Sequence, residues 1–427
     1  MRSFKVLGFC LLLVILGYSC ASKRNVVQQQ NQSYLYTPGS GFIHPEYVVF
    51  HQSDTASQLL IRLNTDELLF NQANPENAMQ AKVKIQYQLF DITTDPANKK
   101  IADSASYIRK FDKQNGKRVI VTSISVKAIP GKIYSLRISL SDIIHNTYQQ
   151  NMITVNKMTH FSSQNFKILT HPNDAPLFRS YLNTDEPIHI IANQPNTKKL
   201  FVKYHKDNTP LPLPPFSVAV EPTFNFKADS LWVFDYNPQQ AFLLTYKGFY
   251  FVQTDTTQKE GLLLANYGEN YPKIRGAQAM IPPLEFITTS EEFRKLQSND
   301  KYKLTVDNYW LGLNGNPEIT RELIRIYYTR MTYANQYFTS YKEGWKTDRG
   351  MIYMIFGPPS YIKKEATNEI WEYYVRQDAT NLSITFNKIT TPYSENHYIM
   401  IRNDSYSPFW RTAIDSWRKG KVYSIEE

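Results

Sequence analysis

The feature that most constrains the fold is an alternation of apolar and polar residues in the first half of the chain. Residues 83–89 carry Val, Ile, Tyr and Leu at every second position with Lys or Gln between them, and residues 133–140 repeat the pattern. Successive side chains of a strand point to opposite faces, so both segments are predicted to be half-buried strands. Turn signals lie between such segments at Asp95-Pro96, Asn115-Gly116 and Pro130-Gly131. No amphipathic helix interrupts them, which predicts an immunoglobulin-like β-sandwich over residues 46–160.

A second sandwich is predicted over residues 161–287. Residues 198–204 alternate in the same way, and residues 241–252 form a largely apolar run. Between them, the proline-rich residues 210–215 are excluded from a central strand, because proline donates no ladder hydrogen bond. We interpret them as a rigid connector, with docking into an aromatic groove as the alternative.

The composition changes in residues 288–427, where helical signals begin. Residues 290–293 start a short helix, and Asn316 with Pro317 opens a long one, as an N-cap followed by proline at the first helical position. Apolar side chains recur there at helical spacing: Ile319, Leu323, Ile326, Tyr327, Ala334 and Phe338. The predicted fold class is therefore mainly β with an α+β C-terminal part.

The first 19 residues have the pattern of a secretory signal peptide. A short basic start precedes an uncharged apolar run that is too short to span a bilayer comfortably. The sequence Leu-Gly-Tyr-Ser-Cys that ends at Cys20 is similar to a bacterial lipobox, which implies a diacylated Cys20 at the mature N-terminus. A plain signal peptide with an incidental cysteine is the alternative. Cys10 lies inside the signal, so no disulfide is expected in the folded body.

The residues after Cys20 bear on location and partners. Residues 20–45 begin with a Gln- and Asn-rich stretch that is interpreted as a flexible tether between lipid and fold. Residues 21–24 are basic toward their end, unlike the acidic start of surface lipoproteins that this pattern resembles, which favours the periplasmic face of the outer membrane. The charge without the signal is about +8, and the basic residues are scattered, so nucleic acid is not an expected partner.

Residues 341–359 combine three glycines, a tryptophan, an Asp-Arg pair and two prolines. We predict that Gly344 ends the long helix in a left-handed conformation, that residues 347–350 form a tight turn, and that residues 351–356 form a buried strand stopped by Gly357. A phosphate-binding P-loop is excluded, because no Gly-Lys-Ser/Thr sequence leads into a helix.

This segment resembles the signature of the GWxTD domain family of Bacteroidetes and related bacteria. The residues that carry the resemblance are Gly344, Trp345, Thr347, Asp348, Arg349, Gly350, Gly357, Pro358 and Trp371. Proteins of this family are typically exported lipoproteins or secreted multi-domain chains. The resemblance implies a small α+β domain and names no chemical activity.

The acidic residues of this region are candidates for either catalysis or structure. Asp348, Glu369 and Glu372, with Arg349 and His397 nearby, are the candidates for a glycan or peptidoglycan hydrolase. Asp after Thr in a turn more commonly bonds backbone amides, so we favour a structural role and predict no catalytic residue. The eight histidines show no metal-binding spacing, no Gly-x-Ser-x-Gly elbow is present, and no metal or cofactor is predicted.

Five of the six tryptophans lie in the C-terminal part, at positions 310, 345, 371, 410 and 417. They are predicted to build a core, with a glycan-binding surface as the alternative. Ser407 as N-cap and Pro408 as first residue are predicted to start a terminal helix that ends at Gly420, with Trp410, Ile414 and Trp417 on one face. This face either folds back on the domain, which we favour, or forms a docking face for a partner.

These observations predict a non-enzymatic outer-membrane lipoprotein that acts as a binding or assembly component of the cell envelope. Its expected partners are the membrane through the lipid, another envelope protein, and a glycan or peptidoglycan as a further option. Four triplets are similar to an O-glycosylation pattern of Bacteroidetes envelope proteins, at residues 54–56, 103–105, 229–231 and 255–257.

Overall fold

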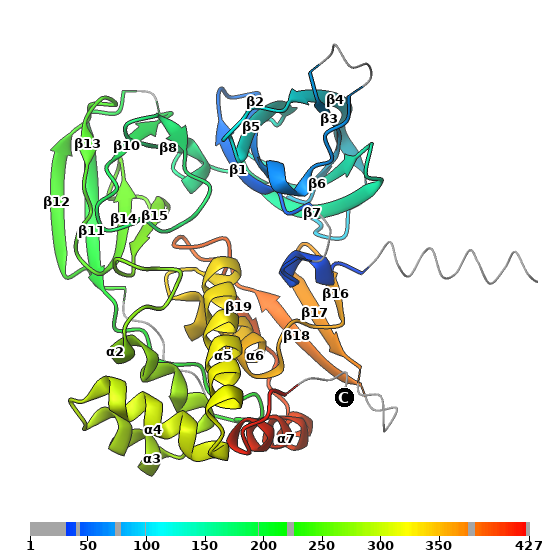
Figure 1. Cartoon of the computed structure of the whole chain (residues 1–427). Coiled ribbons are helices and arrows are strands. Elements are labelled where there is room, and N and C mark those ends of the chain that lie inside the picture. The colour runs from blue at the N-terminus through cyan, green and yellow to red at the C-terminus, as the bar shows by residue number, and fades with distance from the viewer. Residues whose placement is uncertain are drawn as a thin grey trace, which may run out of the picture.

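The computed structural model describes residues 31–39, 43–72, 78–98, 100–194, 196–219, 226–374 and 381–423. The predicted signal peptide and Cys20 lie outside these residues. Two strand-built bodies lie next to each other, and a third body of helices and one sheet lies against both (Figure 1). In the described residues, no helix is long and apolar enough to cross a membrane.

The first body is a sandwich of two antiparallel sheets, with strand orders β1-β2-β5 and β4-β3-β6-β7. Its strands are β1 (Glu46–His51), β2 (Ala56–Asn64), β3 (Gln80–Asp91), β4 (Ile101–Asp112), β5 (Val119–Lys127), β6 (Ile133–Asp142) and β7 (Thr147–Asn156). Along β3, Val83, Ile85, Tyr87 and Leu89 are buried between the two sheets, and the residues between them are more exposed. The predicted alternation is confirmed, because its period of two matches the pleat of the strand.

The second body is also built from two antiparallel sheets, with orders β13-β10-β8-β9 and β12-β11-β14-β15. Its strands are β8 (Phe166–Thr170), β9 (Ala175–Pro176), β10 (Ile188–Ala192), β11 (Lys199–Lys206), β12 (Ser230–Asp235), β13 (Ala241–Phe242), β14 (Gly248–Gln253) and β15 (Leu262–Asn266). Residues 210–215 belong to no strand. One shared core lies between the sheets and includes Ile190, Val202 and Val252.

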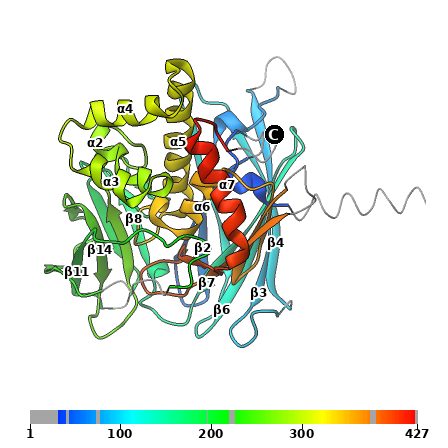
Figure 2. The same ribbon diagram turned by 90° about the horizontal axis from the view of Figure 1, so that it is seen from below.

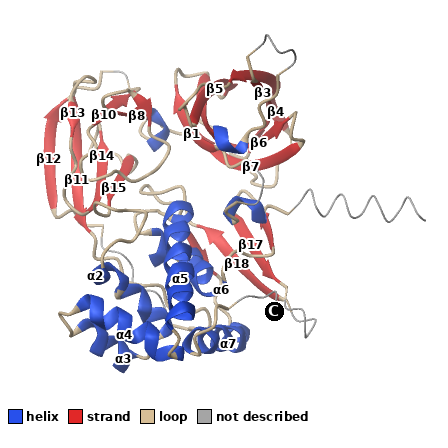
Figure 3. Cartoon of the chain, viewed as in Figure 1, coloured by secondary structure: helices blue, strands red, loops and turns tan. Residues whose placement is uncertain are grey.

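The third body gathers most of the helices (Figure 3). They are α2 (Ala277–Met280), α3 (Ser290–Gln297), α4 (Tyr302–Asn314), α5 (Pro317–Phe338), α6 (Asp348–Phe356) and α7 (Ser407–Arg418). The antiparallel sheet has the order β16-β17-β18-β19, with β16 (Tyr361–Lys364), β17 (Asn368–Tyr373), β18 (Leu382–Lys388) and β19 (Tyr398–Met400). Short 3-10 turns complete the chain: η1 (Ser33–Tyr36), η2 (Thr65–Glu67), η3 (Ser163–Asn165), η4 (Pro282–Ile287), η5 (Gly344–Lys346) and η6 (Asp404–Tyr406). The helices begin at Ala277, before the boundary predicted at residue 288.

The predicted helix starts of α3 and α5 are confirmed by their caps. Asn316 accepts hydrogen bonds from the amides of Glu318 and Ile319, at 2.8 and 3.2 Å. Thr289 and Glu292 form a reciprocal capping box at the start of α3. Such caps satisfy amides that have no partner within the helix, which is why they can be identified from the sequence.

The buried strand predicted for residues 351–356 was wrong, since these residues form most of helix α6. Every residue of α6 is buried, so the segment is apolar all round and carries no periodicity that would separate helix from strand. Its start is set by Thr347, whose side chain accepts a hydrogen bond from the amide of Gly350. The predicted tight turn at residues 347–350 is thus the first turn of a helix.

The flexible tether predicted to reach residue 45 also needs correction where the structure describes it. Residues 31–37, which we call the strap, contain η1 and lie between β7 of the first body and β16 of the third (Figure 1). Tyr36 is only 6% exposed and belongs to the core of the third body. The asparagine and glutamine that suggested a solvated tether instead bond the edge of a sheet.

Candidate functional site

In the segment Gly344–Gly350, which we call the motif, the backbone packs closely against itself and against the end of α5. The Thr347 hydroxyl donates to the carbonyl of Gly344 at 2.7 Å and accepts from the amide of Gly350 at 3.0 Å. One side chain therefore ends η5 and begins α6. Because the hydroxyl donates its only proton within the chain, Thr347 serves as a structural link between these two elements.

Gly344 and Gly350, the first and last residues of the motif, must be glycine because a side chain at either position would collide with backbone atoms. A Cβ added to Gly344 would lie 2.1 Å from the carbonyl oxygen of Ala334 in α5, and one added to Gly350 would lie 1.9 Å from that of Gly344. Neither glycine has a positive φ, so the left-handed helix end predicted at Gly344 was wrong. The long helix ends earlier, at Phe338. Gly357 does have a positive φ, of 84°, and follows the last residue of α6.

Asp348 connects the start of α6 to β19. It is 5% exposed and accepts hydrogen bonds from the amide of Met400 at 2.7 Å and from Nη2 of Arg402 at 2.8 Å. Arg402 also donates to the carbonyl of Leu213, in the proline-rich connector of the second body. The Asp348 carboxylate is therefore held between one cation, one backbone amide and the N-terminus of a helix, each of which stabilises its negative charge.

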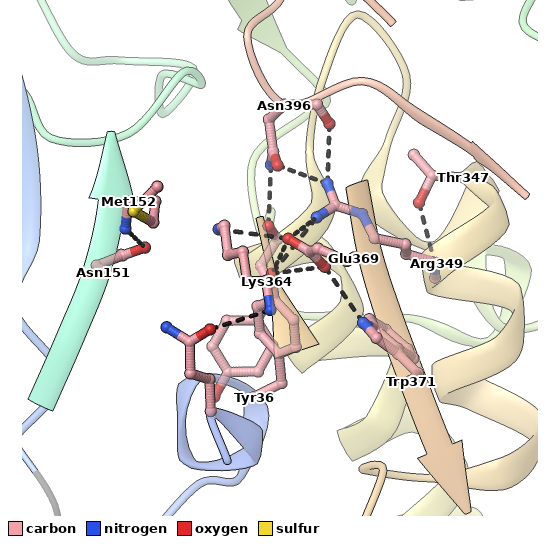
Figure 4. A network of polar contacts seen from close by, with 12 residues as sticks. Tyr36, Asn151, Met152, Thr347, Arg349, Lys364, Glu369, Trp371 and Asn396 are labelled. Carbon is pink, nitrogen blue, oxygen red and sulfur yellow. Dashed lines mark hydrogen bonds and ion pairs between the residues drawn. The ribbon is translucent and has the colours of Figure 1, made fainter. Parts of the chain in front are cut away.

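Arg349 is buried, 1% exposed, and points into the interior of the third body (Figure 4). Its Nη1 lies 3.1 Å from Oε1 of Glu369, and its Nη2 donates to the backbone carbonyl of Asn396 at 2.9 Å. The guanidinium lies 3.9 Å from the centre of the Tyr398 ring. Although burial alone would lower the pKa of Arg349, the Glu369 carboxylate together with Tyr36 and Tyr398 outweighs burial and raises that pKa.

Glu369 is the centre of this buried network, with no exposed surface. Its carboxylate accepts from Arg349, from Tyr36 of the strap at 2.9 Å and from Nε1 of Trp371 at 3.2 Å, and Nζ of Lys364 lies 3.3 Å away (Figure 4). Burial raises the pKa of Glu369, but the charges of Arg349 and Lys364 outweigh burial and hold it at about 2. Sequence reasoning missed Tyr36 as a partner of Glu369, because no local pattern links residues so far apart.

The middle of the motif faces the second body. Lys346 lies 2.8 Å from Oε1 of Glu343 and 2.9 Å from Oδ2 of Asp207, which follows β11. Nε1 of Trp345 donates to Glu343 at 3.0 Å, and the Trp345 ring packs edge-on against Phe286. Burial lowers the pKa of Lys346, but the two carboxylates outweigh it and raise that pKa. The motif thus joins the third body to the second through Lys346, and it reaches the strap through Arg349 and its partner Glu369.

A family comparison covers this part of the molecule. Residues 248–419 match the model of the GWxTD domain. The chain contains a GWxTD domain. The match begins at Gly248, so it includes β14 and β15 of the second sandwich together with the helices and sheet of the third body.

Other comparisons add little about the GWxTD domain. No curated protein matches the chain. Solved structures with local similarity include a β-glucuronidase of Bacteroides uniformis and its β-glucuronidase 2 bound to a cyclophellitol-derived aziridine. Each is 11% identical and covers 34% of this chain, and the TM-scores are 0.18 and 0.17. The chain spans 14% of the length of these enzymes.

The candidate carboxylates of the GWxTD domain do not face one cleft. On β17, Glu369 points to the buried face with Trp371 and Tyr373, whereas Glu372 lies on the opposite face. Glu372 is partly exposed and accepts from the hydroxyl of Tyr374 at 3.1 Å. His397 is buried, and burial together with the charges of Lys342 and Arg349 lowers its pKa to about 4. In the described residues, no group of His, Cys, Asp and Glu has the arrangement of a metal site.

The tryptophans of the GWxTD domain lie in its core. Trp310, Trp371 and Trp417 have no exposed surface, and Trp345 and Trp410 are 2% and 7% exposed. The alternative of a glycan-binding surface made by these rings is therefore wrong. Of the other residues that carry the family resemblance, Gly357 is buried and Pro358 is exposed beside the buried Pro359.

The terminal helix α7 folds back onto the same core. Figure 2 shows it lying along the outside of the molecule next to α6, and Nε1 of Trp417 donates to the carbonyl of Ile355 in α6 at 3.1 Å. Trp410 is buried, and Ile414 is partly buried against the same core. The face of Trp410, Ile414 and Trp417 is therefore not a docking face in this structure, since it supplies apolar surface that the domain needs.

Proposed function

We propose that this protein is a non-enzymatic, lipid-anchored component of the bacterial outer membrane, in which the GWxTD motif holds the domains in a fixed arrangement for binding or assembly. The observation that carries the proposal is the use of the motif's polar side chains. Thr347, Asp348 and Arg349 are buried, and each makes its hydrogen bonds within the chain.

The contacts of the motif reach each of the other parts of the molecule. Lys346 pairs with Asp207 of the second sandwich, and Asp348 holds Arg402, which bonds the proline-rich connector. Arg349 and Glu369 receive Tyr36 of the strap, which in turn contacts the first sandwich. A segment that fixes three bodies in place is suited to presenting surfaces at set positions, as an assembly component requires.

A hydrolase is less well supported by the same contacts. General acid and base groups need access to substrate and a pKa near the working pH. Glu369 is buried with a pKa of about 2, and Glu372 faces away from it. The local similarity to β-glucuronidases carries no argument for shared chemistry.

The proposed membrane location is based on the sequence of the residues that precede the first described residue, Asn31. The signal-like first residues support diacylation of Cys20, and the basic residues that follow Cys20 support a location on the periplasmic face of the outer membrane. The partner we propose is another envelope protein, to which the first sandwich and the GWxTD domain are presented together near the anchor, because the strap contacts both of them.

Two measurements test this function. Cys20→Ser should move the protein from the membrane fraction to the soluble fraction, and crosslinking in intact cells should recover a defined envelope protein that is lost with this variant. Purified protein incubated with peptidoglycan and envelope glycans should release no new reducing ends or peptides. Turnover by the native protein that a folded Asp348→Asn variant lacks would overturn the proposal.

A further inference from the structure

The first residues of the strap, Asn31 and Gln32 before η1, bond the edge strand β16 of the GWxTD domain. The amide of Gln32 donates to the carbonyl of Ile362 on β16 at 2.9 Å. The amides of Ile362 and Lys364 donate to the side-chain oxygens of Asn31 and Gln32, at 3.1 and 3.0 Å. Because β16 is the outer strand of its sheet, these bonds satisfy backbone groups that an open edge would leave exposed.

Tyr36 fills an aromatic pocket next to this edge. Its ring contacts those of Tyr337, Phe338 and Trp371, with centres 5.4, 4.9 and 5.5 Å apart. Its hydroxyl donates to Glu369, and its carbonyl accepts from the hydroxyl of Tyr353 at 2.7 Å. The pocket therefore recognises a phenol, since phenylalanine would remove one of the hydrogen-bond donors of the buried carboxylate.

The opposite side of the strap belongs to the first sandwich. The hydroxyl of Tyr34 donates to the carbonyl of Gln150 at 2.9 Å and accepts from its amide at 2.8 Å. Gln150 lies on β7, which is the outer strand of its own sheet. The strap thus bonds the outer strands of two sheets, β16 and β7, which belong to two different bodies.

We propose that the GWxTD core contains a peptide-binding site for a tyrosine-bearing segment, and that the strap is its ligand bound in cis. The site consists of the β16 edge, the ring pocket of Tyr337, Phe338 and Trp371, and the carboxylate of Glu369. All of these groups come from residues far from the strap in the chain, so the site does not depend on a covalent connection to its ligand. Release of the strap would expose the β16 edge. It would also remove the strap's contacts between the first sandwich and the GWxTD core.

One consequence rests on the proposed function. If Cys20 carries the lipid, ten residues lie between it and Asn31, and this segment spans about 40 Å at most when extended. A pull on the anchor would then reach the strap before it reaches either sandwich. The binding site itself is tested without the lipid, so its failure and the failure of the membrane assignment are separate results.

The experiment cuts the covalent connection after folding. A protease recognition sequence is inserted after Gly39, in the full chain carrying Cys20→Ser. Gly39 is exposed, and a Cβ placed there would have no atom within 4 Å, so the insertion should be tolerated. After cleavage, native mass spectrometry should find the strap still bound and should follow its replacement by an isotopically heavy peptide of residues 30–38. The uncut protein should not take up the peptide, because its site is filled.

The peptide variant Tyr36→Phe gives the specific readout. It should bind the cut protein at least about tenfold more weakly than the parent peptide, because a buried carboxylate loses a donor. A scrambled peptide of the same composition is the matched control and should not bind. Equal affinity of the Tyr36→Phe peptide, failure of the parent peptide to exchange, or unfolding of the body on cleavage would each overturn the proposal.

Discussion

Arg349 and Glu369 form an ion pair with 1% and 0% exposed side-chain surface, and Nη1 of one lies 3.1 Å from Oε1 of the other. Such a pair is retained only where further hydrogen bonds offset the cost of removing both charges from water. Here the Tyr36 hydroxyl, the Trp371 indole and Lys364 complete the surroundings of the carboxylate. The arginine of the signature sequence therefore belongs to an internal electrostatic centre that also receives the strap.

The first prediction concerns the charge of Glu369. Glu369→Gln should lower the free energy of unfolding by roughly 3 kcal/mol or more, because Arg349 is left buried without its counter-charge. Urea denaturation at neutral pH measures this. The control is Glu372→Gln on the opposite face of β17, which should change stability by less than about 0.5 kcal/mol. Equal effects of the two variants would contradict the role assigned to the pair.

A second prediction concerns Gly350. Gly350→Ala should prevent stable folding of the GWxTD domain, because the new Cβ would lie 1.9 Å from the backbone oxygen of Gly344. The control is Gly312→Ala in α4, where no atom lies within 4 Å of the added group. That variant should gain up to about 1 kcal/mol, since alanine has the higher helix propensity. Thermal unfolding of both proteins would show the contrast, and a folded Gly350→Ala protein with native stability would refute it.

The third prediction is a loss of stability in mild acid. Burial lowers the pKa of both His51 and His397 to about 4 in the folded protein, below the ordinary 6.5. Between these values the unfolded chain binds more protons than the folded one, so stability is complete above pH 6.5 and falls as the pH drops toward 4. Each histidine should account for about 2 kcal/mol between pH 7 and pH 5. Urea denaturation at the two pH values should show this loss, and His51→Gln should reduce it.

A fourth prediction separates structure from chemistry at Asp348. Asp348→Ala and Arg402→Met should each destabilise the protein, and their double-mutant cycle should give a coupling energy of about 1–3 kcal/mol. The matched control is the exposed pair Glu322 and Arg325 of α5, for which the coupling should be at most about 0.5 kcal/mol. Coupling of the Asp348 pair no larger than that of the surface pair would argue against its structural role.

A fifth prediction concerns the terminal helix. Trp417→Ala should cost about 3–5 kcal/mol, because it opens a cavity among Trp310, Tyr327 and Ile355. Arg411→Ala on the exposed side of α7 should leave the stability within about 0.5 kcal/mol of the native value. A chain truncated after Ser405 should fail to fold its third body, and a stable truncated protein would show that α7 is dispensable.

Local sequence patterns determined the regular elements whose signals are local. The alternation along β3 identified its buried face, and the cap at Asn316 marked where α5 begins, because a pleat and a helix start impose their requirements within a few residues. The tertiary structure alone decided the conformation of residues 351–356, since an apolar run fits a buried strand and a buried helix equally. It also decided the role of Gly344, which depends on the closeness of Ala334, and the partnership of Tyr36 with Glu369, which lie 333 positions apart. No propensity or spacing encodes such contacts, because they arise only when the sandwiches, strap and helices pack together.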